Sequence, residues 1–140
     1  NLYHSNVGLA RPYQSLKARG AKIIAVDPRE TVTTQAADIQ LNLLPGTDGA
    51  LALSMAQVII EEGLYDKEFV ETYVYGFQEY QAYVNQFPPE KAEKITGVDK
   101  ELIREAARMY ASNGPAGIMF SASPIRQDRV RCLLAMNMEK

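Results

Sequence analysis

Two short polar stretches of the chain carry residue types that suit a bound nucleotide. The first follows the apolar run 22–26 and consists of Asp27, Pro28, Arg29, Glu30 and Thr31. The second follows Pro45, opens an apolar-periodic segment, and consists of Gly46, Thr47 and Asp48. In dinucleotide-binding folds an acid at the carboxyl end of a strand accepts hydrogen bonds from ribose hydroxyls. A carboxylate at a helix N-terminus can accept paired donors from a guanine edge. The two stretches therefore raise the hypothesis of a nucleotide site.

Each stretch also has a purely local interpretation. Asp27 suits an Asx-turn in which its carboxylate accepts from the backbone of Arg29 or Glu30. Thr47 or Asp48 suits the N-cap of the following helix, a role that contributes roughly 1 kcal/mol. Since only one of these two side chains can be the cap, the other is left for a different partner. Taken singly, each stretch is more often a turn or a cap than a ligand contact, and both interpretations stay open.

Bulk composition narrows the classes of function. The 140 residues carry a net charge of -2, with 46% hydrophobic and 23% charged residues. These are values of a globular domain without the basic footprint of a nucleic-acid-binding protein. No apolar run approaches the roughly 20 residues that cross a bilayer. Cys132 and His4 are the only residues of their types, too few for a zinc or iron–sulfur site. We therefore predict no nucleic acid, no membrane span, and neither metal ligands nor catalytic residues within the chain.

The phosphate signatures of nucleotide-binding domains are missing. The sequence has neither a GxGxxG turn nor a Walker loop. If a dinucleotide binds here, its phosphates are held by an irregular loop or by protein outside this chain. The chain begins at Asn1 without methionine and stops inside an apolar-periodic segment, so we expect a piece of a longer polypeptide.

The elements that would position the two stretches alternate between helix and strand. Patterning predicts strands over 23–26, 39–43 and 117–120, and helices over 12–19, 51–60, 67–75, 77–87, 100–112 and 129–138. Residues 31–37 are expected to form a short turn or helix. Leu51, Met55, Val58 and Ile59 should form one apolar stripe on the helix over 51–60. Asp66 and Asp99 should cap the helices that follow them, and Gly76 should separate 67–75 from 77–87. Continuous apolar character predicts that 23–26 is covered on both faces, whereas 39–43 alternates and should lie nearer the sheet edge. The predicted fold is a single α/β domain over 1–140, Rossmann-like and three-layered, with a mainly parallel sheet and helices on both faces.

Two other features are given structural interpretations. The tyrosines of the middle segment should pack with rings inward and hydroxyls outward; they are Tyr65, Tyr73, Tyr75, Tyr80 and Tyr83. The charged run 90–94 is interpreted as solvated surface.

Four blocks of the sequence together resemble one family. They are residues 20–31, 36–38, 44–51 and 61–70, and their order and spacing are similar to those of the molybdopterin oxidoreductases of the dimethyl sulfoxide reductase family. The resemblance extends over about residues 14–122. It implies that residues 27–31 and 46–48 contact the guanosine part of molybdopterin guanine dinucleotide. Asp27 would hold ribose or nearby polar groups, and Asp48 would accept from guanine. Asn1 matches the asparagine of the family's Gly-x-Asn-Pro turn, although Leu2 replaces the proline.

The resemblance also implies what the parent enzyme contains. It would carry molybdenum or tungsten on the pterin cofactor, and an iron–sulfur cluster is possible upstream of this segment. The partners would be the remaining domains of the parent chain and possible electron-transfer subunits, and the piece alone would not be catalytic. Two alternatives from other classes are a non-catalytic nucleotide-binding regulatory module and an interaction domain whose tyrosine-rich helices face a partner. The sequence indicates neither a substrate nor a compartment.

Overall fold

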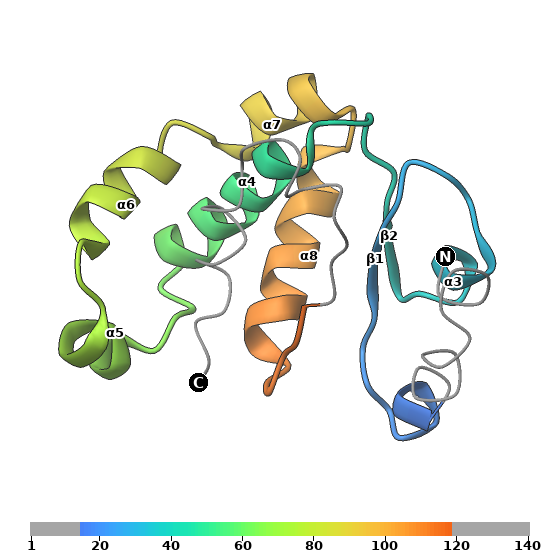
Figure 1. Cartoon of the computed structure of the whole chain (residues 1–140), viewed down its shortest axis with the longest axis horizontal. Helices are drawn as coiled ribbons and strands as arrows, with labels where there is room; N and C mark the ends of the chain where they lie inside the picture. The colour runs from blue at the N-terminus through green and yellow to red at the C-terminus, as the bar shows by residue number, and fades with distance from the viewer. Residues whose placement is uncertain (1–14, 119–140) are drawn as a thin grey trace. The chain divides into compact units, whose positions relative to one another are not determined.

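The computed structural model of the chain describes residues 15–118 (Figure 1). The chain divides into two compact units, with the boundary between Asn42 and Leu43. Both strands lie in the N-terminal unit, and five of the helices, α4 to α8, lie in the C-terminal unit. The described residues are therefore rich in helix, with one small sheet.

The N-terminal unit is built on a parallel pair of strands. β1 (Ile24–Val26) pairs with β2 (Ile39–Leu41) in a register that places Ile24 opposite Ile39 and Val26 opposite Leu41. The crossover contains α3 (Val32–Gln35), so the short helix expected within 31–37 is confirmed. Residues 15–18 are helical and Gly20 has a φ of 85°. The predicted parallel pairing of these two strands is confirmed.

Burial of the first strand differs from the prediction. Ala25 is buried, but Val26 is 46% exposed. The expectation that this strand is covered on both faces is therefore wrong in this structure, because an apolar run of four residues does not show which faces find a cover. The second strand follows its alternating pattern, with Ile39 and Leu41 buried around a half-buried Gln40. Among the described residues the sheet has two strands, and the three-layer Rossmann-like arrangement remains a prediction.

The C-terminal unit is organised around α4 (Asp48–Glu61), which packs against α6, α7 and α8. Every residue from Gly49 to Ile60 is buried, including Ser54 and Gln57. The single apolar stripe expected from the sequence is too narrow, since a helix that is apolar all round belongs in the interior. The start of the site helix is consequently held by packing on all sides.

Two short helices follow α4. α5 (Lys67–Tyr73) begins at Asp66, whose Oδ1 accepts from the backbone N–H of Phe69 at 2.9 Å, as predicted. α6 (Phe77–Val84) begins after Gly76, which has a φ of 76° and separates the two helices. The predicted inward packing of the tyrosine rings is wrong for three of them. Tyr73, Tyr75 and Tyr83 are 74%, 104% and 48% exposed, because α5 and α6 bury one residue each, Val70 and Val84.

The last two described helices are α7 (Pro89–Thr96) and α8 (Lys100–Ser112). α7 was not expected from the sequence. Proline at its first position and left-handed Gly97 after its last turn are its start and stop signals, and Ala92 within the charged run is buried. Asp99 caps α8, accepting from the backbone N–H groups of Glu101 and Leu102 at 2.8 and 3.2 Å, which confirms the predicted cap.

Several predicted elements fall partly or wholly outside the described residues. Residues 117 and 118 are not in a strand, and the remainder of the predicted strand 117–120 lies outside the description. The same holds for the start of helix 12–19 and for helix 129–138. Within residues 15–118, no helix combines the length and apolar character needed to span a membrane.

Candidate functional site

The first stretch begins where β1 ends. The backbone N–H of Asp27 donates to the carbonyl of Leu41 at 3.3 Å, so the strand pairing extends to this residue. Its Oδ1 accepts from the backbone N–H of Arg29 at 2.9 Å and lies 3.5 Å from the Arg29 Nε. The Asx-turn interpretation is thus confirmed. Both contacts use Oδ1, so Oδ2 has no hydrogen bond within residues 15–118 and stays available to an outside donor.

The rest of this stretch is occupied mainly by local bonds. Thr31 caps α3: its Oγ1 accepts from the Thr34 backbone N–H at 3.2 Å, and the Thr34 Oγ1 accepts from the Thr31 N–H at 2.7 Å. Glu30 accepts from the Gln35 side-chain amide at 3.1 Å. Pro28 is exposed, and the Arg29 side chain is 74% exposed. This loop therefore has a defined shape, with the Arg29 guanidinium turned to solvent.

Asp38 was not singled out from the sequence, yet it fixes the entry to β1. Its carboxylate accepts from the Ile23 backbone N–H at 3.0 Å and from the Lys22 ammonium at 3.1 Å. These contacts, the Ile23 bond first, lower the pKa of the Asp38 carboxyl below its usual value. Asp38 ties the residues before β1 to those before β2, and so helps to set where Asp27 lies.

The second stretch forms the turn into α4. Gly46 has a φ of 89°, in the left-handed region that favours glycine. Thr47 occupies the N-cap position but makes no side-chain cap. Its hydroxyl instead donates backward to the Leu44 carbonyl at 2.6 Å. Of the two possible caps, Thr47 and Asp48, the Thr47 side chain does not cap the helix, because its hydroxyl closes the preceding turn.

Asp48 is the residue that this arrangement leaves unused. It is the first residue of α4 and half-buried. Its carboxylate makes no hydrogen bond or ion pair with any residue of the described chain. Asp48 thus presents two acceptor oxygens at a fixed position, which is the arrangement that a pair of neighbouring N–H donors requires.

The turn before Asp48 is anchored to the end of α7. The Leu44 backbone N–H donates to the Thr96 carbonyl at 2.8 Å. The fully buried Thr96 hydroxyl in turn donates to the Ala92 carbonyl and accepts from the Val98 N–H, at 2.8 and 3.1 Å. Two segments about fifty residues apart in sequence therefore fix where the Asp48 helix begins.

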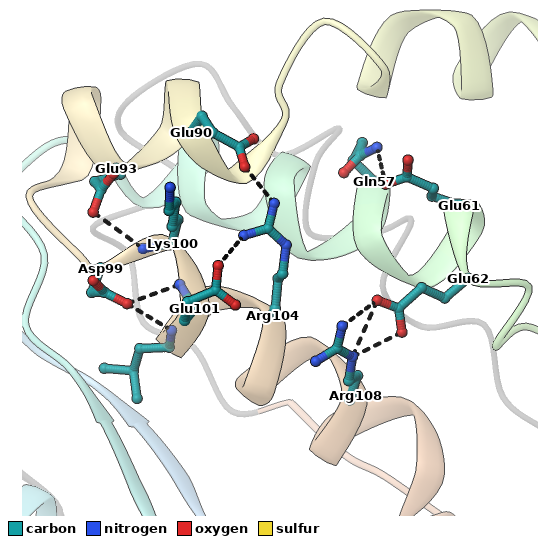
Figure 2. A network of polar contacts seen from close by, with 11 residues as sticks. Gln57, Glu61, Glu62, Glu90, Glu93, Asp99, Lys100, Glu101, Arg104 and Arg108 are labelled. Carbon is teal, nitrogen blue, oxygen red and sulfur yellow. Dashed lines mark hydrogen bonds and ion pairs between the residues drawn. The ribbon is translucent and has the colours of Figure 1, made fainter.

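A network of charged side chains joins α4, α7 and α8 (Figure 2). Arg108 donates to both carboxylate oxygens of Glu62, with Nε at 3.1 and 2.9 Å and Nη2 at 2.7 Å. Arg104 pairs with Glu90 and, at 2.7 Å, with Glu101. The hydrogen bond from Arg108 lowers the pKa of the Glu62 carboxyl, and that from Arg104 lowers the pKa of Glu90. Each carboxylate here is matched by a guanidinium, so the network supports the helices rather than offering a binding site.

The two stretches lie in different units, Asp27 in the N-terminal and Asp48 in the C-terminal unit. Asn1 lies outside the described residues. Over residues 15–118 no group of three or more His, Cys, Asp or Glu side chains is arranged to hold a metal ion. The carboxylates of Asp27 and Asp48 are hydrogen-bond acceptors, and such groups bind and orient a ligand.

Comparison with known proteins places this chain in a family. Residues 1–138 match the family model described as molybdopterin oxidoreductase. Acetylene hydratase of Syntrophotalea acetylenica is 44% identical over 139 residues, which cover 93% of this chain and 19% of the relative. The alpha subunit of the F420-dependent formate dehydrogenase of Methanocaldococcus jannaschii is 42% identical over 120 residues, covering 86% of this chain and 18% of that protein.

The structural comparison agrees. The solved structure of acetylene hydratase from Pelobacter acetylenicus matches with a TM-score of 0.89 and 40% sequence identity, over 99% of this chain and 20% of that one. The chain belongs to the molybdopterin oxidoreductase family, in which the pterin cofactor carries molybdenum or tungsten. It spans about a fifth or less of the length of these relatives.

Proposed function

We propose that this chain holds the guanosine end of molybdopterin guanine dinucleotide within a larger molybdenum- or tungsten-dependent oxidoreductase. The observation that carries the proposal is the Asp48 carboxylate. It stands at the start of a helix whose next twelve residues are all buried, and no described residue uses it. A carboxylate that no described protein group uses keeps its acceptor oxygens for the donors of a ligand.

Guanine fits this carboxylate by its hydrogen-bonding pattern. Its ring N1–H and exocyclic amino group are neighbouring donors on one edge, and a carboxylate can accept from both at once. Adenine offers an acceptor where guanine has N1–H, so it cannot make the same pair. Because α4 is packed all round, the carboxylate is held in place before the ligand arrives, which lowers the entropy lost on binding.

The first stretch supports the proposal through Asp27. Its Oδ2 is free to accept from a ribose hydroxyl, at the carboxyl end of a parallel strand where ligands of such sheets bind. Glu30 and Thr31 use their side chains locally, so they would shape the loop around the nucleotide. The role of Asn1 stays a prediction from the resemblance.

The larger polypeptide would supply the reaction. When bound, the metal at the far end of the cofactor provides the redox chemistry, and the residues described here bind and orient the nucleotide end. The proposal includes further domains of the parent chain, electron-transfer subunits, a possible iron–sulfur cluster upstream, and a Rossmann-like three-layer architecture. No observation on this chain favours a nucleotide-binding regulatory module.

Nucleotide titration of the 140-residue chain tests the base contact. We expect GDP to bind about tenfold or more tightly than IDP, which lacks only the exocyclic amino group, and ADP to bind least. The Asp48→Asn variant keeps the shape of the side chain but loses one acceptor, so the preference for GDP over IDP should largely disappear. Glu105→Gln, an exposed change on α8, serves as the matched control and should bind as the unaltered chain does.

The same variant in the larger polypeptide gives an independent readout. Purified protein is acid-treated and digested, and GMP released per polypeptide is measured. Asp48→Asn should lower this ratio, whereas Glu105→Gln should not. Equal affinity for GDP and ADP, or unchanged GMP content in the Asp48 variant, would overturn the assignment.

A further inference from the structure

One surface of the C-terminal unit is left uncovered by the described chain. Phe69 and Tyr73 lie one helical turn apart on α5, with ring centroids 5.2 Å apart, and Tyr75 follows in the connection to α6. Their exposures are 38%, 74% and 104%. We refer to Phe69, Tyr73 and Tyr75 as the aromatic ridge. α5 forms the left-hand end of the C-terminal unit in Figure 1.

The helix beneath the ridge has little packing of its own. Val70 is the one buried residue of α5, which is seven residues long. Helices this short are marginal in water and derive most of their stability from tertiary contacts. An exposed pair of aromatic rings on such a helix, followed by the exposed Tyr75, is typical of a surface that packs against another protein surface.

The electrostatics of the ridge favour a cationic partner. Glu68 and Glu71 flank it, are exposed, and make no ion pair or hydrogen bond with any described residue. The sequence has no Lys, Arg or His from residue 68 to residue 90. The last turn of α5 also contains no basic residue, so its partial negative charge is uncompensated.

Arginine can interact with both the aromatic rings and the carboxylates of this surface. A guanidinium stacks on exposed aromatic faces and binds carboxylates through two parallel hydrogen bonds. Nucleic acid would be repelled by the two glutamates, and two copies of the ridge would bring like charges together. The complementary surface is therefore a protein surface that presents arginine side chains.

We propose that the aromatic ridge is an internal docking surface, covered by an arginine-bearing surface of another domain of the same larger polypeptide. The chain spans 18–20% of the matched relatives, so most of such a polypeptide lies on the same molecule at high effective concentration. The inference rests on the proposed function only in requiring that larger polypeptide. It does not depend on guanine binding.

Hydrogen–deuterium exchange in the 140-residue chain and in the larger polypeptide tests the inference. We expect peptides covering 67–76 to exchange about tenfold more slowly in the larger polypeptide, while peptides covering 48–61 change little. In the larger polypeptide, the double variant Tyr73→Ser, Tyr75→Ser should restore fast exchange at 67–76. The double variant Glu68→Gln, Glu71→Gln should do so in part, whereas Glu105→Gln should have no effect.

Each alternative result decides against the inference. Equal exchange of 67–76 in the two proteins would show that the ridge stays uncovered. If exchange at 67–76 is slower in the larger polypeptide but the tyrosine substitutions do not change it, the protection comes from general stabilisation of the unit. Protection that develops only after a separate subunit is added would assign the ridge to an intermolecular partner. Loss of guanine binding leaves all these readouts intact, so a failure of the proposed function is distinguishable from a failure of this one.

Discussion

Two fully buried hydroxyl groups in the C-terminal unit should respond oppositely to removal. Ser54 Oγ is on α4, has no exposed surface, and has no hydrogen-bond partner within the described chain. Thr96 Oγ1 is equally buried but both donates and accepts, at 2.8 and 3.1 Å. Burying a polar group without a partner costs roughly 1–3 kcal/mol, and a satisfied hydrogen bond contributes about 1 kcal/mol.

We therefore expect Ser54→Ala to raise the free energy of unfolding by about 1 kcal/mol, with helix propensity adding a few tenths. Thr96→Val keeps the side-chain shape but leaves the Val98 N–H without its acceptor. It should lower the free energy of unfolding by about 1–3 kcal/mol. Urea titration followed by circular dichroism measures both, and unchanged m-values would show that the unfolding reaction is the same.

Ser112→Ala, an exposed change in the last turn of α8, is the control and should alter stability by less than about 0.5 kcal/mol. The reasoning is refuted if Ser54→Ala destabilises the chain as much as Thr96→Val does. That result would mean that Ser54 has a partner, such as an internal water, whose loss outweighs the relief of an orphaned hydroxyl.

Three further changes follow from the turns and ion pairs. The pKa of Glu62 is lowered by Arg108, so its contribution to stability is present above the usual value of 4.5 and is lost as pH falls through the lower folded pKa. Arg108→Gln should hence reduce the fall in thermal midpoint that occurs when the pH is lowered below 5, as measured by circular dichroism. Asp99→Ala removes the cap of α8 and should cost about 1 kcal/mol in urea unfolding; no loss would contradict the cap. Gly97→Ala forces a side chain into a φ of 76° and should cost about 1–2 kcal/mol by the same assay, with a neutral result refuting the strain.

Local signals in the sequence predicted those parts of the fold that depend on neighbouring residues. The caps by Asp66 and Asp99 and the Asx-turn of Asp27 each rely on a side chain within three positions of the backbone it contacts, and the break at Gly76 relies on the positive φ of that glycine. Such short-range hydrogen bonds are visible in the order of residue types. The parallel pairing of the first two strands was also predicted, because an apolar run, a short crossover and an alternating run follow one another.

What the sequence could not predict depends on residues far along the chain. Either Thr47 or Asp48 was expected to cap α4, but the Thr47 hydroxyl donates back to the carbonyl of Leu44, whose N–H is held by Thr96. The inward packing of Tyr73 and Tyr75 failed because periodicity tells which residues share a face but not whether a neighbour covers that face. α7 was missed since its charged residues concealed the proline and glycine signals at its ends.

The candidate site shows the same division. The types and spacing of residues 27–31 and 46–48 suggested nucleotide binding, yet each also served as a plausible turn. The hydrogen bonds in the structure show which side-chain atoms of each stretch serve the local turn and which are left for a ligand. Asp27 turns out to use one carboxylate oxygen for the turn, and Asp48 turns out to use neither of its oxygens within the described chain. Sequence alone could not show which of Thr47 and Asp48 is left free for a ligand, because the side chain of either residue can cap a helix.

The central position of α4 has a consequence for synthesis of the chain. Its packing partners, α6, α7 and α8, all follow it in sequence. A ribosome that has completed α4 must add about 50 more residues before α8 is finished, which takes roughly 2.5–10 s at 5–20 residues per second. During that interval an apolar helix has no finished core to enter. Nascent chains that stop within this window are therefore the ones that should associate with chaperones or aggregate, and slowing translation between α4 and α8 should increase that fraction.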